Sequence, residues 1–393
     1  MSARIAGYAH PIEATADLSD AALEQVTKDL QVNAEENDRT ARFPWEGIYR
    51  VHEAGLLIAP VRARFGGQNA GALDTVRIFL ALGKGDPAVA LIAAMTYFVH
   101  LYNEEGAEFV HWPPALYQEI LAASRTRPVL LNSINAEPSG VTRERVGVPV
   151  TSVRREAGGW VLNGHKTSAT GSEGLDYHIV WAYDASTGRP GFALVPGRAA
   201  GIEVVKTWDH LGQRASSSHD VIYRDVRLPP ANFITRPSSF AAGRGRGSVV
   251  DLMAAAAYLG AARAAQDFYH QYVTDYATAR PDRAAAAMDA MRLAAGEIEA
   301  QLLLADSTVR QAAMEFDDGD TETAGEKAML VKLIATRGAV AAVDTAMATL
   351  GNHGLTRRNP LERHYRDVLV SRAHVPKDHD ALMAAGRRLL SQE

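Results

Sequence analysis

Three polar side chains in this sequence could take part in acid–base or hydrogen-bonding chemistry. His100 lies within the apolar stretch of residues 88–102, Thr170 stands directly before Gly171, and His374 lies near the C-terminus. An imidazole can donate or accept a hydrogen bond near neutral pH, and a hydroxyl can do both. Each also has a structural interpretation: a hydrogen-bonded core histidine, a turn threonine that bonds its own backbone, and a histidine on a solvated final helix.

Several other chemistries are excluded or disfavoured. The sequence has no cysteine, which removes disulfides, thiolate nucleophiles, iron–sulfur clusters and cysteine-ligated zinc. His374 and His379 have i,i+5 spacing, which suits two metal ligands on one helix face poorly, so we expect no metal site. Redox chemistry would therefore need an organic cofactor, either bound or borrowed.

Composition and charge are ordinary for a soluble globular protein and give no sign of a nucleic-acid or membrane protein. The 393 residues are 47% hydrophobic and 22% charged, with a net charge of −5, so no overall attraction to nucleic acid or an anionic membrane is expected. No uninterrupted apolar run approaches the roughly 18 residues of a spanning helix. The first residues lack the apolar core of a signal peptide, and we therefore expect a cytoplasmic location.

The chain divides into three segments with different sequence patterns. Residues 1–126 are expected to form an N-terminal helical domain, in which Ser19 caps a helix over residues 20–33. Residues 88–102 are apolar nearly all round, which predicts a buried helix.

Residues 127–235 change to short β-rich runs that are separated by Gly, Pro, Asn and Asp. Their spacing is typical of an antiparallel β-barrel or sandwich, and the absence of intervening helices argues against a doubly wound parallel sheet. Residues 236–393 return to helix and are expected to form a C-terminal helical bundle. The overall prediction is therefore an α+β multi-domain protein.

The clearest helix of the bundle is expected between residues 323 and 350. Thr323 and Glu326 have capping-box spacing, and Gly351 stands where a C-cap glycine would. Apolar residues between them repeat by threes and fours, which indicates a core seam or a subunit interface.

Six short motifs stand in order along the chain. They are Gly55-Leu56-Leu57 with Phe65-Gly66-Gly67; Asn135-Ala136-Glu137-Pro138; Trp160-Val161-Leu162-Asn163-Gly164-His165-Lys166; Leu211-Gly212-Gln213-Arg214 with Val226-Arg227-Leu228-Pro229; Leu350-Gly351 with Gly354; and Arg366-Asp367. With the helical, β, helical order, these motifs resemble the acyl-CoA dehydrogenase superfamily over nearly the whole chain. The resemblance implies that superfamily's fold, a flavin cofactor and a dimer of dimers.

The catalytic base of the dehydrogenases is missing from this pattern. In those enzymes a glutamate a few residues after the Arg-Asp pair removes the substrate α-proton, and here that position holds Val375. Some members carry the base on the first long helix of the C-terminal domain, a position that falls near Val250, one residue from Asp251. Loss of general-base catalysis typically costs about 10²–10⁴-fold in rate.

Residues 166–172 are instead similar to a motif of the flavin-dependent monooxygenases of the same superfamily, the branch that includes dibenzothiophene monooxygenase. These enzymes lack the glutamate and often carry a histidine and a proline after the Arg-Asp pair, as in His374 and Pro376. The resemblance implies that reduced flavin, FMN or FAD, comes from a separate flavin reductase. It would react with O₂ to a C4a-hydroperoxide, which hydrogen bonds and an apolar pocket would protect.

The resemblance also assigns roles to single residues. His100 would lie on the active-site helix, Thr170 would contact the flavin ring, and His374 would contact the peroxide or the substrate. The cofactor-binding residues implied are Asn135, Thr142, Thr170, Arg280 and Gly351, although Arg280 has lost the motif that surrounds it in the family. Gly351 is equally well explained as a helix cap.

Three functions are compatible with these observations. The first is a two-component monooxygenase that acts on a small apolar or aromatic substrate. The second is an acyl-CoA dehydrogenase-like FAD enzyme that oxidises a CH–CH bond with a displaced base, Asp251 or Glu297. The third is an inactive acyl- or flavin-binding scaffold.

We also expect an oligomer, a homotetramer or at least a dimer. The apolar seam of residues 329–350 and the apolar stretch of residues 252–259 need more cover than one bundle is expected to offer.

Overall fold

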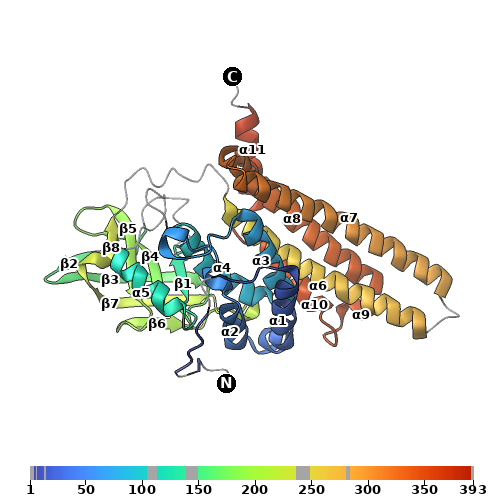
Figure 1. The fold of residues 1–393 in the computed structure, drawn as a ribbon, viewed down its shortest axis with the longest axis horizontal. Helices are drawn as coiled ribbons and strands as arrows, with labels where there is room; N and C mark the ends of the chain where they lie inside the picture. Colours follow the sequence, from blue (N-terminus) through green and yellow to red (C-terminus); the bar gives the residue numbers. More distant parts are fainter. Residues whose placement is uncertain are drawn as a thin grey trace.

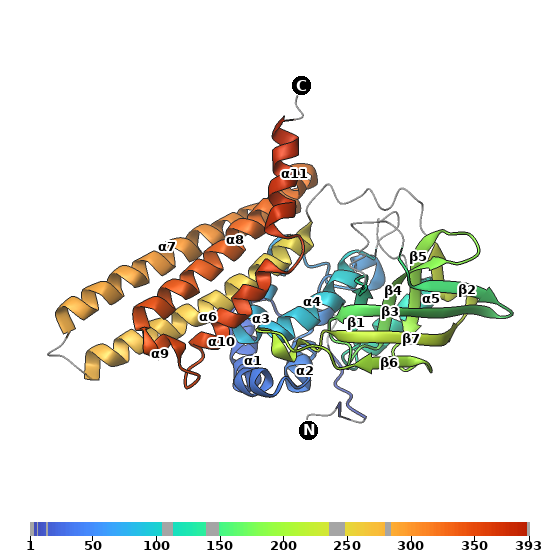
Figure 2. The same cartoon turned by 180° about the vertical axis from the view of Figure 1, so that it is seen from behind.

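The computed structural model describes residues 4–5, 7–12, 15–103, 113–138, 149–235, 248–279 and 284–390. Its parts follow the expected order: helices, a β-sheet and a second set of helices. Figures 1 and 2 show the sheet at one end of the molecule and the long C-terminal helices at the other, with the N-terminal helices between them. The fold class predicted from the sequence is confirmed.

The regular secondary structure of the N-terminal part is helical in the described residues. Its helices are α1 (Asp20–Thr40), α2 (Trp45–Glu53), α3 (Ala72–Gly85), α4 (Pro87–Leu101) and α5 (Pro114–Ser124), with 3₁₀ turns η1 (Leu56–Ile58) and η2 (Ala63–Phe65). Ser19 caps α1 as predicted, because its side chain accepts a hydrogen bond from the Ala22 N–H. Helix α4 is almost entirely buried, as its continuous apolar character predicts, and Asp86 caps its first turn.

The central part is one eight-stranded sheet. Its strands are β1 (Leu131–Ile134), β2 (Ser152–Glu156), β3 (Gly159–Ala169), β4 (Tyr177–Asp184), β5 (Pro190–Pro196), β6 (Ile202–Val205), β7 (His219–Leu228) and β8 (Phe233–Thr235). The order is β6-β7-β3-β2-β4-β5-β8, with β1 beside β4. Most pairs are antiparallel as predicted, but β1 and β2 each run parallel to β4, so the sheet is mixed.

The C-terminal part contains the longest helices. They are α6 (Val249–Ala279), α7 (Ala284–Asp317), α8 (Thr321–Leu350), α9 (Asn352–Leu355), α10 (Leu361–Leu369) and α11 (Asp378–Leu390), with η7 (Val370–Arg372) between the last two. Helices α6, α7 and α8 pack against one another, and α3 packs on α6. By length and composition alone α8 could cross a membrane, but 56% of its most apolar window is buried within the protein.

The ends of α8 test two predictions. Asp320, not Thr323, caps its start, because the Asp320 side chain accepts from the Thr323 N–H and the helix already begins at Thr321. The capping box predicted at Thr323 and Glu326 is therefore wrong. Gly351 ends the helix as predicted, with a positive φ of 56° and its N–H donating to the Met347 carbonyl.

The apolar seams are covered within one chain. Leu252, Met253 and Leu259 of α6 are buried, as are Val343 and Met347 of α8. The expectation that these two stretches need a second subunit to cover them is therefore wrong. Apolar side chains are exposed instead on α7, at Leu293, Leu303, Leu304 and Met314.

Candidate functional site

The loop after β1 is held by a buried ion pair. Lys166 of β3 donates to Glu137 at 2.7 Å, and the two side chains are 0% and 2% exposed. Glu137 also accepts from the backbone N–H groups of Val150 and Thr151. Burial alone would raise the pKa of Glu137, but the hydrogen bonds from Lys166 and Thr151 lower it, while burial lowers the pKa of Lys166 to about 8. These residues of the second and third motifs therefore fix the loop that carries Asn135.

Thr170 lies at the start of a chain of hydroxyl groups. It follows β3, is 8% exposed, and its Oγ1 lies 3.0 Å from the Ser218 Oγ. Ser218 Oγ in turn lies 2.9 Å from the Ser216 Oγ. The Thr170 carbonyl accepts from Asn132 Nδ2 at 2.8 Å, so β1 and the end of β3 are tied together here. Thr170 is thus oriented by two neighbouring segments and not only by its own turn.

His374 is linked to the same turn from the other side. It lies between η7 and α11, and its Nδ1 lies 3.1 Å from the Tyr258 Oη of α6. Tyr258 is fully buried and lies near the side chain of Gln213, whose carbonyl accepts from the Ser216 N–H. Hydrogen bonds through Ser218 connect Thr170 to the 3₁₀ turn η3 (Arg214–Ser216). Tyr258, which bonds His374, lies near the start of the same turn.

A buried lysine fixes the backbone around His374. Lys332 of α8 donates to the His374 carbonyl at 2.7 Å and to the Pro376 carbonyl at 2.6 Å. Burial lowers the Lys332 pKa to about 8, and nearby Asp251 opposes that shift. The histidine is therefore held at its ring and at its carbonyl, which a side chain on a solvated helix face would not be.

His100 is a buried histidine with one unused ring nitrogen. It is 0% exposed on α4, and its Nδ1 lies 3.1 Å from the Tyr117 Oη of α5. Its Nε2 has no hydrogen-bond partner within the described part of the chain. Burial lowers the His100 pKa to about 4, so the ring is neutral at pH 7. One turn earlier, Thr96 exchanges hydrogen bonds with the Leu131 backbone of β1, which places α4 against the strand that leads to Asn135.

The Arg-Asp pair of α10 has a structural role. Arg366 makes an ion pair with Asp38 of α1 at 2.6 Å and a second with Glu362 at 2.7 Å. Asp367 accepts from the Gln213 N–H at 2.6 Å, and burial raises its pKa to about 7. These contacts connect α10 to α1 and to the turn that lies between Thr170 and His374.

The structure brings four of the predicted site residues to connected elements: His100, Asn135, Thr170 and His374. Thr142 and Arg280 lie outside the described residues. Gly351 is not brought to this site, because it caps the far end of α8, and both views place the adjoining α9 further from the sheet than α10 (Figures 1 and 2).

The two acids proposed as displaced bases are placed differently. Asp251 is 8% exposed in the first turn of α6, and it hydrogen-bonds the Ser248 N–H. Glu297 lies exposed on α7 and accepts a hydrogen bond from Gln301 in its own helix. Within a single chain, the position of Glu297 therefore does not support a role as an active-site base.

Sequence reasoning missed the residues that connect the site. These are Asn132, Gln213, Ser216, Ser218, Tyr258 and Lys332. The run Ser216-Ser217-Ser218, between the two halves of the fourth motif, was a usable signal, because three adjacent hydroxyls offer several hydrogen-bonding groups at one place. Tyr258 had no such mark within its alanine-rich helix.

A β-sheet that lies between two helical parts in the chain order, with a polar turn at their junction, defines the structural class. Three family models match consecutive parts of the chain: the acyl-CoA dehydrogenase N-terminal domain at residues 13–108, the middle domain at residues 136–226 and the C-terminal domain at residues 251–374. The chain therefore belongs to the acyl-CoA dehydrogenase superfamily, as the motifs implied.

Relatives of similar length are named after different activities. A Bacillus subtilis (strain 168) protein named "Putative acyl-CoA dehydrogenase YdbM" is 28% identical, over 90% of this chain and 92% of its own. Dibenzothiophene monooxygenase from Mycolicibacterium goodii is 27% identical, over 94% and 92%. The solved structure of KijD3 in complex with FMN and dTDP-3-amino-2,3,6-trideoxy-4-keto-3-methyl-D-glucose has a TM-score of 0.80 at 25% identity, covering 97% of each chain.

Proposed function

We propose that this protein is a flavin-dependent oxidoreductase and, more specifically, a two-component monooxygenase. It would accept reduced flavin, FMN or FAD, from a separate reductase and use O₂ to oxygenate a small apolar or aromatic substrate. Dibenzothiophene monooxygenase and the amino sugar nitrososynthase DnmZ of Streptomyces peucetius, 27% identical over 88% of this chain and 86% of its own, support this choice among the relatives.

The turn of residues 374–376 carries the proposal. Where the resemblance expects a carboxylate, Val375 offers an apolar side chain that is 45% exposed. Its neighbour His374 is held by Tyr258 and Lys332. The site thus has a fixed imidazole but no carboxylate base at the dehydrogenase position. This combination favours hydrogen bonding to a flavin peroxide over abstraction of a substrate α-proton.

The residues present fit a flavin at the end of β1. Two buried polar atoms have no hydrogen-bond partner among the described residues: His100 Nε2 on α4, which packs on β1, and Asn135 Oδ1 directly after β1. An unsatisfied buried donor or acceptor costs about 1–3 kcal/mol, so a polar ligand that bonds these atoms would stabilise the site. Thr170, Asn135 and the His100 ring would hold the flavin.

The bound flavin would supply the activation of O₂. Within the chain, Thr170 would donate a hydrogen bond to the ring edge, with Ser218 as its second partner. Tyr258 would keep the His374 imidazole in one orientation, and the buried apolar residues of α4 would exclude water.

A displaced-base desaturase remains the second candidate. Asp251 is a nearly buried carboxylate close to Lys332. Its negative charge stabilises the protonated form of Lys332. Because α-proton abstraction needs such a base, this one observation favours the alternative. A scaffold without activity is the third possibility, and it predicts no turnover of either kind.

Location, domain limits and assembly complete the proposal. We place the protein in the cytoplasm, with domains that divide near residues 126 and 235, and as a homotetramer. Its partners would be the substrate, O₂ and the reductase.

The test is flavin binding followed by reaction with air. The purified protein should be colourless and should bind reduced FMN under anaerobic conditions. On mixing with air in a stopped-flow instrument, it should delay the return of oxidised-flavin absorbance compared with free FMN. A yellow protein that holds FAD tightly and is bleached by an acyl-CoA would instead establish the desaturase.

A further inference from the structure

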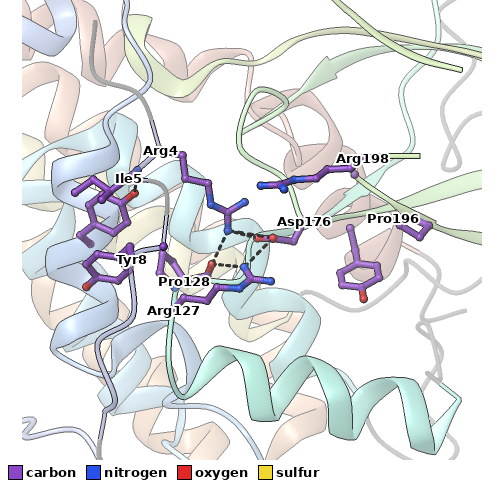
Figure 3. Close-up of a pocket in the computed structure, with 12 residues that line it drawn as sticks. Arg4, Ile5, Tyr8, Arg127, Pro128, Asp176, Pro196 and Arg198 are labelled. Atoms are coloured by element: carbon purple, nitrogen blue, oxygen red, sulfur yellow. Dashed lines mark hydrogen bonds and ion pairs between the residues drawn. The ribbon is translucent and has the colours of Figure 1, made fainter. Parts of the chain in front are cut away.

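A cleft lined by arginines lies where the N-terminal segment meets the sheet. It has a volume of about 580 Å³, within the roughly 300–1,000 Å³ of small-molecule sites. Figure 3 shows its lining, with Arg4 and Tyr8 from the N-terminal segment, Arg127 from the loop before β1, and Arg198 from the loop after β5. A second hollow of about 660 Å³ shares Arg4 and Arg198 with it, so the two adjoin.

Positive charge exceeds negative charge in this cleft. Among the described residues, Asp176 is its one lining carboxylate, against the guanidinium groups of Arg4, Arg127 and Arg198. The chain as a whole carries a net charge of −5, so the charge of the cleft is opposite in sign to that of the whole protein. Like charges gathered in a concave site raise the local concentration of anions.

Asp176 holds two of these arginines through one nitrogen each. Arg4 Nη2 lies 3.1 Å and Arg127 Nη1 2.8 Å from Asp176 Oδ1, and the same two nitrogens donate to the Pro128 carbonyl. Asp176 Oδ2 also accepts from the Leu130 N–H, so the carboxylate is satisfied. This network orients the arginines without using all of their donors.

Several guanidinium donors are left over. Among the described residues, no acceptor bonds the Nε or the second Nη of Arg4 or of Arg127. Arg198 is exposed and has no hydrogen bond or ion pair within the described chain, and in Figure 3 its guanidinium points toward Asp176. Planar forks of free N–H donors match phosphate oxygens in pairs.

Aromatic rings form another wall of the cleft. Tyr8 stacks on Tyr49 with 4.2 Å between ring centroids, and both residues line the cleft. Tyr8 is fixed further by its hydroxyl, which donates to Glu53. A preformed stack of this kind offers a flat surface to the ring of a ligand.

We propose that this cleft binds a small phosphorylated aromatic molecule, of which a nucleotide is the simplest. Its phosphates would lie against the three arginines, and its ring against the tyrosine stack. None of the lining residues belongs to the set of residues that links Thr170 to His374. The site is therefore separate from the proposed flavin site and does not depend on it.

The experiment is calorimetric titration of the full chain with ADP, and with adenosine and pyrophosphate separately. ADP should bind with one site per chain and more tightly than either fragment. Arg198→Ala should weaken binding of both ADP and pyrophosphate by about 10- to 100-fold, because it removes charge-assisted hydrogen bonds. Tyr8→Leu should weaken binding of ADP and leave that of pyrophosphate unchanged.

Arg189→Ala is the matched control, because Arg189 is also exposed but lies in the β4–β5 turn, outside the cleft. If the Arg189 and Arg198 variants lost the same amount of ADP affinity, the effect would come from the overall charge of the protein and not from the cleft. That result would overturn the proposal. So would an absence of ADP binding, or pyrophosphate binding as tight as that of ADP. The Arg198 variant should still delay flavin oxidation, so this proposal and the proposed function can fail separately.

Discussion

At the scale of single residues, the position of His374 gives the sharpest prediction. His374→Ala should still bind reduced flavin and still react with O₂, because the other contacts remain. The yield of oxygenated product should fall and that of H₂O₂ should rise, by about 10- to 100-fold, since one hydrogen bond to a charged group is worth about 1.5–3 kcal/mol. Product and peroxide yields per O₂ measure this change.

A second histidine provides the control. His379 lies exposed on α11, five residues further along the chain, so His379→Ala changes the same side chain outside the site. If the two variants behave alike and match the parent protein, His374 has no part in the chemistry. Tyr258→Phe should give a smaller effect in the same direction, because it removes only the group that orients the ring.

The hydroxyl of Thr170 can be tested by an isosteric change. Thr170→Val keeps the shape but removes the hydrogen bond to Ser218 and the proposed one to the flavin ring. We expect weaker flavin binding, by about 10-fold, for the loss of one hydrogen bond of about 1 kcal/mol plus the unpaired partner. Ser218→Ala removes the same protein contact but keeps the Thr170 hydroxyl, so its flavin affinity, measured by fluorescence titration, should change less.

At the scale of elements, the Glu137–Lys166 pair determines how the loop after β1 sits on β3. Lys166→Met would leave the Glu137 carboxylate buried without its counter-ion, which typically costs about 3–5 kcal/mol. Urea unfolding should report this loss. Arg154→Ala, which breaks exposed contacts with Glu156 and Asp225, should cost no more than about 1 kcal/mol. Similar losses in both variants would contradict the importance of the buried pair.

The contact between α10 and the Gln213 turn should make stability depend on pH. Burial raises the Asp367 pKa from 3.8 to about 7, so between these values the folded carboxyl keeps a proton that the unfolded one releases. The contribution of this group to stability therefore falls as pH rises through that window. Asp367→Asn cannot ionise, so its unfolding free energy should rise relative to the parent protein from about pH 4 to pH 7. A difference that stays constant with pH would contradict this.

The order and type of the helices and strands could be predicted from the sequence more fully than the contacts between them. Ser19 marks the start of α1, and continuous apolar character marks α4, because both signals are local. Strand β1 has a weak local signal, because it is only four residues long and carries the polar Asn132 and Ser133. Asp320 and Thr323 are competing caps three residues apart, and only the backbone decides between them.

The site itself was predictable only at its ends. Thr170 and His374 could be named because they stand within recognisable motifs. The link between them passes through the turn that carries Gln213 and Ser218 and then through Tyr258. That turn and Tyr258 are far apart in the chain and meet only after the sheet and the bundle have packed. Such long-range contacts leave no local periodicity to read.

At the scale of the whole molecule, the exposed apolar side chains of α7 indicate where a second copy would pack. Leu293 and Leu304 are 77% and 63% exposed, and their separation of about three helical turns places them on one face. Exposed apolar area grouped on one helix face favours association, because its burial stabilises by about 25 cal/mol per Å². This face replaces the buried seams as the reason to expect an oligomer.

The last prediction follows from that face. In sedimentation velocity at micromolar concentration, the parent protein should be larger than a monomer, and Leu293→Glu/Leu304→Glu should shift it toward a smaller species, since two charges would be buried in the contact. Val32→Glu is the control, because Val32 is 78% exposed on α1, and it should leave the assembly intact. A monomeric parent protein would contradict the oligomer outright. An unchanged double variant would show that the subunits meet elsewhere on the molecule.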